Sequence, residues 1–229
     1  MLELKKVTKA YISDKGIFDV TIQFHEGEIT GILGRNGSGK TTLLKSILDL
    51  IQIDAGEILL DGSHVYDRYQ DVAFISEEGS FMPNMTALEY GRFLKDYYKH
   101  FDFHDYQALL EQFEISKEGK IKDFSKGQKM KTEIAAGFSM HAKLIVLDEP
   151  FNGLDVYAKE DTIKLLIQQL HEDTVILIST HNIEEIETIA DRCIVMEKGK
   201  IRKDVKMDQL HEVGMDLKDL LDQYRTEIK

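Results

Sequence analysis

The chain has 229 residues, of which 42% are apolar and 31% charged, and its formal net charge is −12. This length suffices for one sizeable α/β domain with a smaller subdomain, and the acidic balance argues against general binding to a nucleic-acid backbone. The single cysteine, Cys193, excludes an internal disulfide. The first residues lack the apolar stretch of a signal peptide, and no apolar run approaches the roughly 18 residues that span a bilayer. We therefore expect that any membrane role would require another chain to do the spanning.

The first third of the chain predicts strands with one helix among them. Alternating or short apolar runs, which are typical of strands, occur at residues 2–10, 17–24, 28–33, 56–60 and 72–76. A helix is predicted over residues 41–51, because Leu44, Ile47 and Ile51 share one face. A glycine-rich loop joins this helix to the strand before it.

The middle of the chain, roughly residues 80–141, predicts helices only. Thr86 and Glu89 have the spacing of a capping box, which starts a helix, and apolar residues follow at three- and four-residue spacing. Two more helices are expected over residues 105–115 and 125–140. These patterns predict an inserted helical subdomain.

The last third returns to strands that alternate with helices, as in a parallel sheet. The predicted strands are 144–147, 174–179, 193–196 and 200–205, and the predicted helices are 158–170 and 182–190. We expect a single domain, 1–229, with a core formed by residues 1–79 and 142–206, a helical subdomain at 80–141 and a charged, helical C-terminal tail at 207–229.

Residues 34–41, Gly-Arg-Asn-Gly-Ser-Gly-Lys-Thr, fit the phosphate-loop (P-loop) pattern G-x-x-x-x-G-K-[ST]. Glycines let consecutive N–H groups turn toward an anion, and the following helix N-terminus adds unpaired donors. Lys40 can then reach the β- and γ-phosphates of ATP, and the Thr41 hydroxyl can ligate Mg²⁺. The residues expected to contact the nucleotide are Gly34, Arg35, Asn36, Gly37, Ser38, Gly39, Lys40, Thr41 and Thr42. A P-loop alone leaves kinases, GTPases, helicases and transport ATPases open.

Two later strands end in residues that could complete such a site. The strand at 144–147 is followed by Asp148 and Glu149, and ligands collect at the carboxyl ends of parallel strands. Asp148 is placed to hold Mg²⁺, and Glu149 could accept a proton from the water that attacks the γ-phosphate. His181 follows the next strand, so we expect it beside the γ-phosphate, although a lone histidine is more often structural.

A second anion site is predicted at Ser125. Ser125 and Gln128 have capping-box spacing, and a serine with free amides at a helix start can also bind an anion. Because the P-loop already provides the chain's own phosphate site, the second site can serve a neighbouring molecule.

Taken in order, these motifs make the chain resemble an ATP-binding-cassette (ABC) ATPase over nearly its whole length. The ordered set is Tyr11, the P-loop, a loop near Glu77, the helical insertion, residues 124–128, Asp148 with Glu149, residues 152–155 and His181. The resemblance implies an α/β P-loop NTPase fold with a mixed sheet, and a head-to-tail dimer that holds two ATPs between its subunits. The resemblance also implies a role for each site residue. Within one subunit, Tyr11 stacks on adenine, Thr41 and Asp148 bind Mg²⁺, Glu149 is the general base and His181 contacts the γ-phosphate. Across the dimer interface, Ser125, Gly127 and Gln128 act on the partner's ATP, and Asp155 links the two sites.

The chain departs from the family pattern at two points. The usual signature is Leu-Ser-Gly-Gly-Gln, whereas Phe124 and Lys126 replace its leucine and first glycine here. A cation at a helix N-terminus is unfavourable by about 0.3–1 kcal/mol, and we hypothesise that the partner's ATP phosphates offset this cost. Glu77 replaces a glutamine, so it could lie near the Mg²⁺ or be simply exposed.

The family's commonest role is to power transport by separate membrane subunits. The signature and Glu77 resemble those of Gram-positive exporters for antimicrobial or toxic peptides, such as the phenol-soluble modulin exporters. The resemblance implies an ATP-hydrolysing subunit at the cytoplasmic face of the cell membrane, with a second cassette and an integral membrane subunit as partners and no nucleic acid. The alternative is a soluble single-cassette ABC ATPase of a non-transport assembly system.

The surface expected to dock the membrane subunit is the helical subdomain with the loop at residues 77–86. Phe81, Met82 and Met85 could fill a groove for a partner helix, or they could equally form local core.

Overall fold

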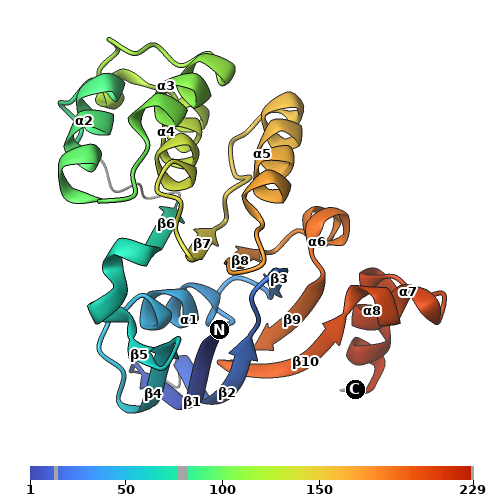
Figure 1. The fold of residues 1–229 in the computed structure, drawn as a ribbon. Helices are drawn as coiled ribbons and strands as arrows, with labels where there is room; N and C mark the ends of the chain where they lie inside the picture. The colour runs from blue at the N-terminus through green and yellow to red at the C-terminus, as the bar shows by residue number, and fades with distance from the viewer. Residues whose placement is uncertain (13–14, 77–81, 228–229) are drawn as a thin grey trace.

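The computed structural model describes residues 1–12, 15–76 and 82–227. Within these ranges one helix packs between the two sheets, and the other helices cover the opposite face of the larger sheet or lie beyond its edges (Figure 1). Glu77 and Phe81 of the expected docking loop lie outside the described residues.

The smaller sheet is antiparallel, with four strands in the order β2-β1-β4-β5. Its strands are β1 (Leu2–Ala10), β2 (Gly16–Phe24), β4 (Ala55–Leu60) and β5 (Ser63–His64). The alternation of β1 and β2 arises because one face of each strand is buried, as predicted. The two residues of β5 are too few to carry a sequence pattern.

The larger sheet has six strands in the order β10-β9-β3-β8-β7-β6. They are β3 (Glu28–Leu33), β6 (Val72–Ser76), β7 (Leu144–Asp148), β8 (Val175–Thr180), β9 (Arg192–Glu197) and β10 (Lys200–Lys206). The pairs from β9 to β6 are parallel and β10 is antiparallel to β9, so the predicted mixed sheet is confirmed. Alternate residues of β7 enter two different apolar clusters, which explains its unbroken apolar run.

The helix α1 (Lys40–Ile47) packs with the smaller sheet and one face of the larger sheet. The opposite face is covered by α4 (Lys126–Phe138), α5 (Val156–Gln169) and α6 (Ile183–Ile189). α1 ends before the predicted residue 51, because Asp49 adopts a positive φ of 53° and Leu50 points into solvent.

The inserted segment is helical, as expected. α2 (Ala87–Tyr97), α3 (Phe103–Gln112) and α4 pack together beyond the end of β6 (Figure 1). Thr86 and Glu89 form both hydrogen bonds of the predicted capping box. Of the two described methionines of the expected docking loop, Met85 packs against the core of this region, whereas the side chain of Met82 is exposed.

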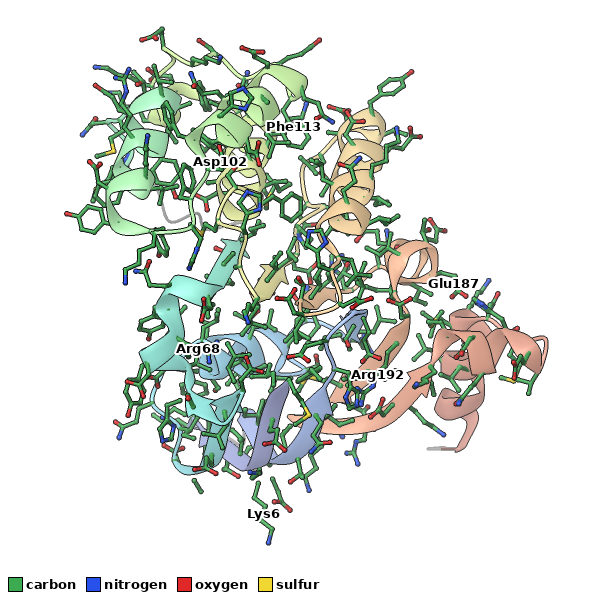
Figure 2. All side chains as sticks on the ribbon, viewed as in Figure 1. Lys6, Arg68, Asp102, Phe113, Glu187 and Arg192 are labelled. Carbon is green, nitrogen blue, oxygen red and sulfur yellow. The ribbon has the colours of Figure 1, made fainter. Side chains whose placement is uncertain are left out.

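The remaining helices lead into β6 and α4 or form the C-terminal tail. η1 (Val65–Asp71) leads into β6, and η2 (Ile121–Asp123) precedes α4. The tail forms α7 (Met207–Glu212) and α8 (Leu217–Glu227), and Glu187 of α6 accepts hydrogen bonds from both of them (Figure 2). No helix within the described ranges is both long and apolar enough to cross a bilayer.

Arg192 joins the two sheets at the start of β9 (Figure 2). Its guanidinium makes two hydrogen bonds to Asp204, of 2.7 and 2.6 Å, and one of 3.2 Å to Glu28. It also donates to the Gln23 carbonyl of the smaller sheet at 2.8 Å. The side chain is largely buried, so this cation depends on all three partners.

The Arg192→Met variant is expected to lose about 2–3 kcal/mol of stability, because it leaves two carboxylates without their hydrogen-bonded cation. Urea unfolding followed by circular dichroism measures the loss. The matched control is Arg202→Met, which removes a half-exposed guanidinium 3.6 Å from Glu197 and should shift the free energy of unfolding by less than about 0.5 kcal/mol. Equal unfolding midpoints for the two variants would contradict this role for Arg192.

Candidate active site

The register of the larger sheet brings the predicted motifs to one edge. Leu33 of β3 pairs with Thr180 of β8, Ser179 pairs with Asp148 of β7, and Asp148 pairs with Ser76 of β6. The residues that directly follow these strand ends are Gly34 of the P-loop, His181 and Glu149. The expected convergence of the strand ends on the P-loop is therefore present.

The P-loop presents uncapped backbone donors. Gly37 and Gly39 have positive φ values of 80° and 108°, which favour glycine, and a Cβ at Gly39 would lie 2.9 Å from the Gly16 carbonyl oxygen. Gly39 is the N-cap of α1, and no side chain of the described residues caps that helix start. Within the same described ranges, the buried hydroxyl of Ser38 has no hydrogen-bond partner. A loop with these unpaired donors fits an anionic group such as a phosphate.

Lys40 lies over this loop with only 6% of its surface exposed. Its ammonium donates to the Gly34 carbonyl at 2.7 Å and lies 3.4 Å from Oε1 of Glu149. The cation is thus held between the P-loop and the residue predicted to be the base.

Glu149 is held from both its backbone and its carboxylate. Its φ of 51° is in the left-handed region, which costs of order 1–3 kcal/mol for a residue with a side chain, and its N–H donates to the Ser179 carbonyl at 3.0 Å. Its Oε2 lies 2.9 Å from Nδ1 of His181, whose side chain is 52% exposed. The two carboxylate oxygens therefore face Lys40 and His181 separately.

Ser179 is a site residue that sequence reasoning missed. It is fully buried, and its hydroxyl donates to the carboxylate of Asp148. This contact fixes Asp148 at the strand end where a metal ligand was predicted. The available signal was a hydroxyl residue at the end of an otherwise apolar strand.

A cavity of about 740 Å³ lies beside the P-loop. Its lining comes from Leu33–Ser38, His181, Ile183, Val195–Lys198 and Leu221. The described residues 124–128, predicted as a second anion site, do not take part in this lining. Lys40, Asp148 and Glu149 do not line this cavity either.

Ser125, where a second anion site is predicted, is the N-cap of α4. Ser125 and Gln128 form a complete capping box, with hydrogen bonds of 3.2 and 2.9 Å. A Cβ at Gly127 would lie 2.8 Å from the Gly153 carbonyl oxygen, and the aliphatic part of Lys126 also lies against Gly153. The start of α4 and the loop before α5 are thus packed together.

Asp155 is the N-cap of α5. Its carboxylate accepts the Ala158 N–H at 2.9 Å, which lowers the pKa of Asp155 below its usual value. Its other oxygen lies 3.8 Å from Nζ of Lys131 on α4. Asp155 is exposed, so its predicted role across a subunit interface stays a prediction.

Tyr11 follows β1 with 46% of its surface exposed, and Lys9 Nζ lies 5.6 Å from the centre of its ring. Part of the Tyr11 ring is accessible, and its stacking on adenine stays a prediction. Glu77, predicted near Mg²⁺, lies outside the described residues, although Ser76 before it pairs with Asp148.

The fold and the residues grouped around the P-loop define a P-loop nucleotide-binding protein. Comparison with known proteins identifies its family. The family profile described as ABC transporter matches residues 17–152. The chain belongs to the ABC transporter ATP-binding family. It is an ATP-binding and ATP-hydrolysing subunit of an ABC transporter, so the predicted class and activity are confirmed.

The curated relatives span most of the chain. The ABC transporter ATP-binding protein YtrB of Bacillus subtilis is 32% identical, over 93% of this chain and 74% of the relative. The bacitracin transport ATP-binding protein BcrA of Enterococcus faecalis is also 32% identical, over 93% and 71%. The SkfA peptide export ATP-binding protein SkfE of Bacillus subtilis is 30% identical, over 93% and 92%.

Solved structures agree with the fold. An ATP-binding subunit of an ABC transporter superposes with a TM-score of 0.87 at 27% identity, covering 100% of both chains. The cassette MJ0796, solved as a dimer in a post-hydrolysis state with ADP and Pi, gives a TM-score of 0.80 at 25% identity, covering 90% of this chain and 99% of that one. Cassettes of this family dimerise and pair with membrane subunits.

Proposed function

We propose that this chain hydrolyses ATP with Lys40 as the phosphate ligand, Glu149 as the general base and His181 as the partner of both Glu149 and the γ-phosphate. The observation that carries the proposal is the Glu149 carboxylate, held between Lys40 and His181 at the mouth of the P-loop. A general base must lie within hydrogen-bond reach of the attacking water, and this placement satisfies that requirement.

ATP binding would rearrange the Lys40 contact. The triphosphate carries several negative charges, and it competes with the single charge of Glu149 for the ammonium 3.4 Å away. When Lys40 turns to the phosphates, Oε1 of Glu149 becomes free to accept a proton. Oε2 stays hydrogen-bonded to His181, which keeps the carboxylate in place.

Mg²⁺ is the metal that the donor set fits best. The Thr41 hydroxyl and the Asp148 carboxylate are hard oxygen ligands beside the loop, and Ser179 already orients Asp148. When bound, Mg²⁺ would neutralise charge on the β- and γ-phosphates.

The complete site would form between two subunits arranged head to tail. Ser125 and Gln128 form the capping box that starts α4, and the start of a helix is a place where an anion can bind. Ser125, Gly127 and Gln128 would therefore contact the partner's ATP, with Lys126 beside its phosphates. The dimeric state of the related cassette MJ0796 supports this arrangement.

The membrane subunit would dock beside η1 and the end of α2. These elements are neighbours, since Gln70 of η1 donates to the Tyr97 carbonyl at 3.1 Å and the Tyr69 hydroxyl donates to the Leu48 carbonyl at 3.4 Å, and they carry exposed apolar side chains. These side chains are Leu50, Tyr66, Tyr69 and Tyr97, which we call the η1 surface. Tyrosines of this kind are enriched at protein interfaces. The segment 80–141 would then move as a subdomain against a core of 1–79 and 142–206.

The transported molecule would be a peptide moving out of the cell. The relatives SkfE, a peptide export ATP-binding protein, and BcrA, a bacitracin transport ATP-binding protein, support this proposal. The chain would then work at the cytoplasmic face of the membrane, held there by its partner. The alternative of an assembly ATPase predicts a different partner and no membrane attachment.

Co-purification from detergent-solubilised membranes of the native host separates these functions. We expect the tagged chain to bring down an integral membrane protein, and a Tyr66→Glu/Tyr97→Glu variant to lose it while still binding ATP. The matched control is Val213→Glu, an exposed apolar residue at the end of α7, which should keep the partner. A soluble scaffold in place of a membrane protein would support the alternative.

A further inference from the structure

Glu185 of α6 is an acidic residue that none of the family motifs includes. Only 13% of its side chain is exposed, and within the described part of the chain it accepts hydrogen bonds from Thr180, Asn182 and Lys159. Its Oε2 accepts the Thr180 hydroxyl at 2.8 Å, and its Oε1 accepts the Asn182 side-chain amide at 3.3 Å. Thr180 and Asn182 are the two neighbours of His181, so one carboxylate binds the side chains on both sides of that histidine.

The same carboxylate reaches a second element. Lys159 of α5 donates to Oε1 of Glu185 at 3.0 Å. α5 begins at Asp155, which also contacts Lys131 of α4. The contacts thus run from the start of α5 through Lys159 and Glu185 to the segment that carries His181.

We propose that Glu185 is a positioning residue for hydrolysis, and that Lys159 links it to the loop before α5. This inference rests on the proposed roles of His181 and Glu149. Glu185 keeps Thr180 and Asn182 fixed, so that Nδ1 of His181 stays 2.9 Å from the Glu149 carboxylate. The loop before α5 packs against the start of α4, which is proposed to contact the partner's ATP, so Lys159 transmits the position of that loop to His181.

The test is a double-mutant cycle in steady-state ATP hydrolysis by the full chain. Glu185→Ala should lower kcat by roughly 10–100-fold, the cost of misplacing a catalytic group by about 1 Å, with ATP affinity unchanged. In a His181→Ala background the same change should have almost no further effect, because Glu185 acts through His181. An equal loss in both backgrounds would overturn the proposal.

Matched variants separate positioning from folding. Glu184→Ala changes the exposed neighbouring residue of α6 and should leave kcat unaltered.

Lys159→Ala should lower kcat partially and Lys159→Arg should restore it, since an arginine preserves the ion pair. Should Glu185→Ala fail to fold, the Lys159 pair gives the same answer: no loss in Lys159→Ala, or no recovery in Lys159→Arg, contradicts the link. Full turnover by His181→Ala alone would instead refute the proposed function of His181.

Discussion

The Glu149→Gln variant is expected to bind ATP like the unmodified chain and to hydrolyse it about 10²–10⁴-fold more slowly, the usual contribution of a general base. Glutamine has the same shape and can keep a hydrogen bond to His181, but it cannot accept a proton from water. Lys40 also loses its 3.4 Å contact with a charged carboxylate, which favours its turn toward the phosphates. Phosphate release and fluorescent-ATP titration measure the two effects separately.

The control for this variant is Glu160→Gln, which alters an exposed carboxylate on α5. It should hydrolyse ATP at the normal rate. Normal turnover by Glu149→Gln would remove Glu149 from the role of base, and a parallel loss of ATP affinity would show that its main effect is on binding.

The Ser125→Asp variant is expected to lose at least about 10²-fold of its turnover while the monomer still binds ATP. Aspartate caps a helix as well as serine does, so α4 should keep its start. The added charge, however, would face the partner's phosphates, and like charges brought together at an interface cost several kcal/mol. ATP hydrolysis and ATP binding by the isolated chain test both halves of the expectation.

Ser125→Asn is the matched control, because asparagine caps the helix without adding a charge. It should lose much less turnover than Ser125→Asp. If the two variants hydrolyse ATP equally fast, Ser125 has only its structural role as the N-cap of α4.

The sequence predicted those parts of the site that are formed by residues close together in the chain. The P-loop, the strand before Asp148 and the capping boxes at Thr86 and Ser125 are each set by residues a few positions apart, and each is present. The strand ends could be expected to converge because parallel strands share a carboxyl edge.

The residues that were missed depend on contacts between distant segments. Ser179 contacts Asp148 only because β7 and β8 pair in one register, and Glu185 meets Lys159 only because α5 and α6 lie on the same face. The positive φ of Glu149 also has no sequence signal, since it is imposed by its hydrogen bond to β8. Such features follow from tertiary packing rather than from periodicity.

We propose that one chain supplies half of each ATP site and that ATP brings two chains together. Light scattering of the purified Glu149→Gln variant, with and without saturating ATP and Mg²⁺, measures this association. We expect a monomer without ATP, a dimer with ATP, and no ATP-dependent dimer when Ser125→Asp is added to the same chain. A Glu149→Gln protein that binds ATP and stays monomeric, or a double variant that still dimerises, would contradict it.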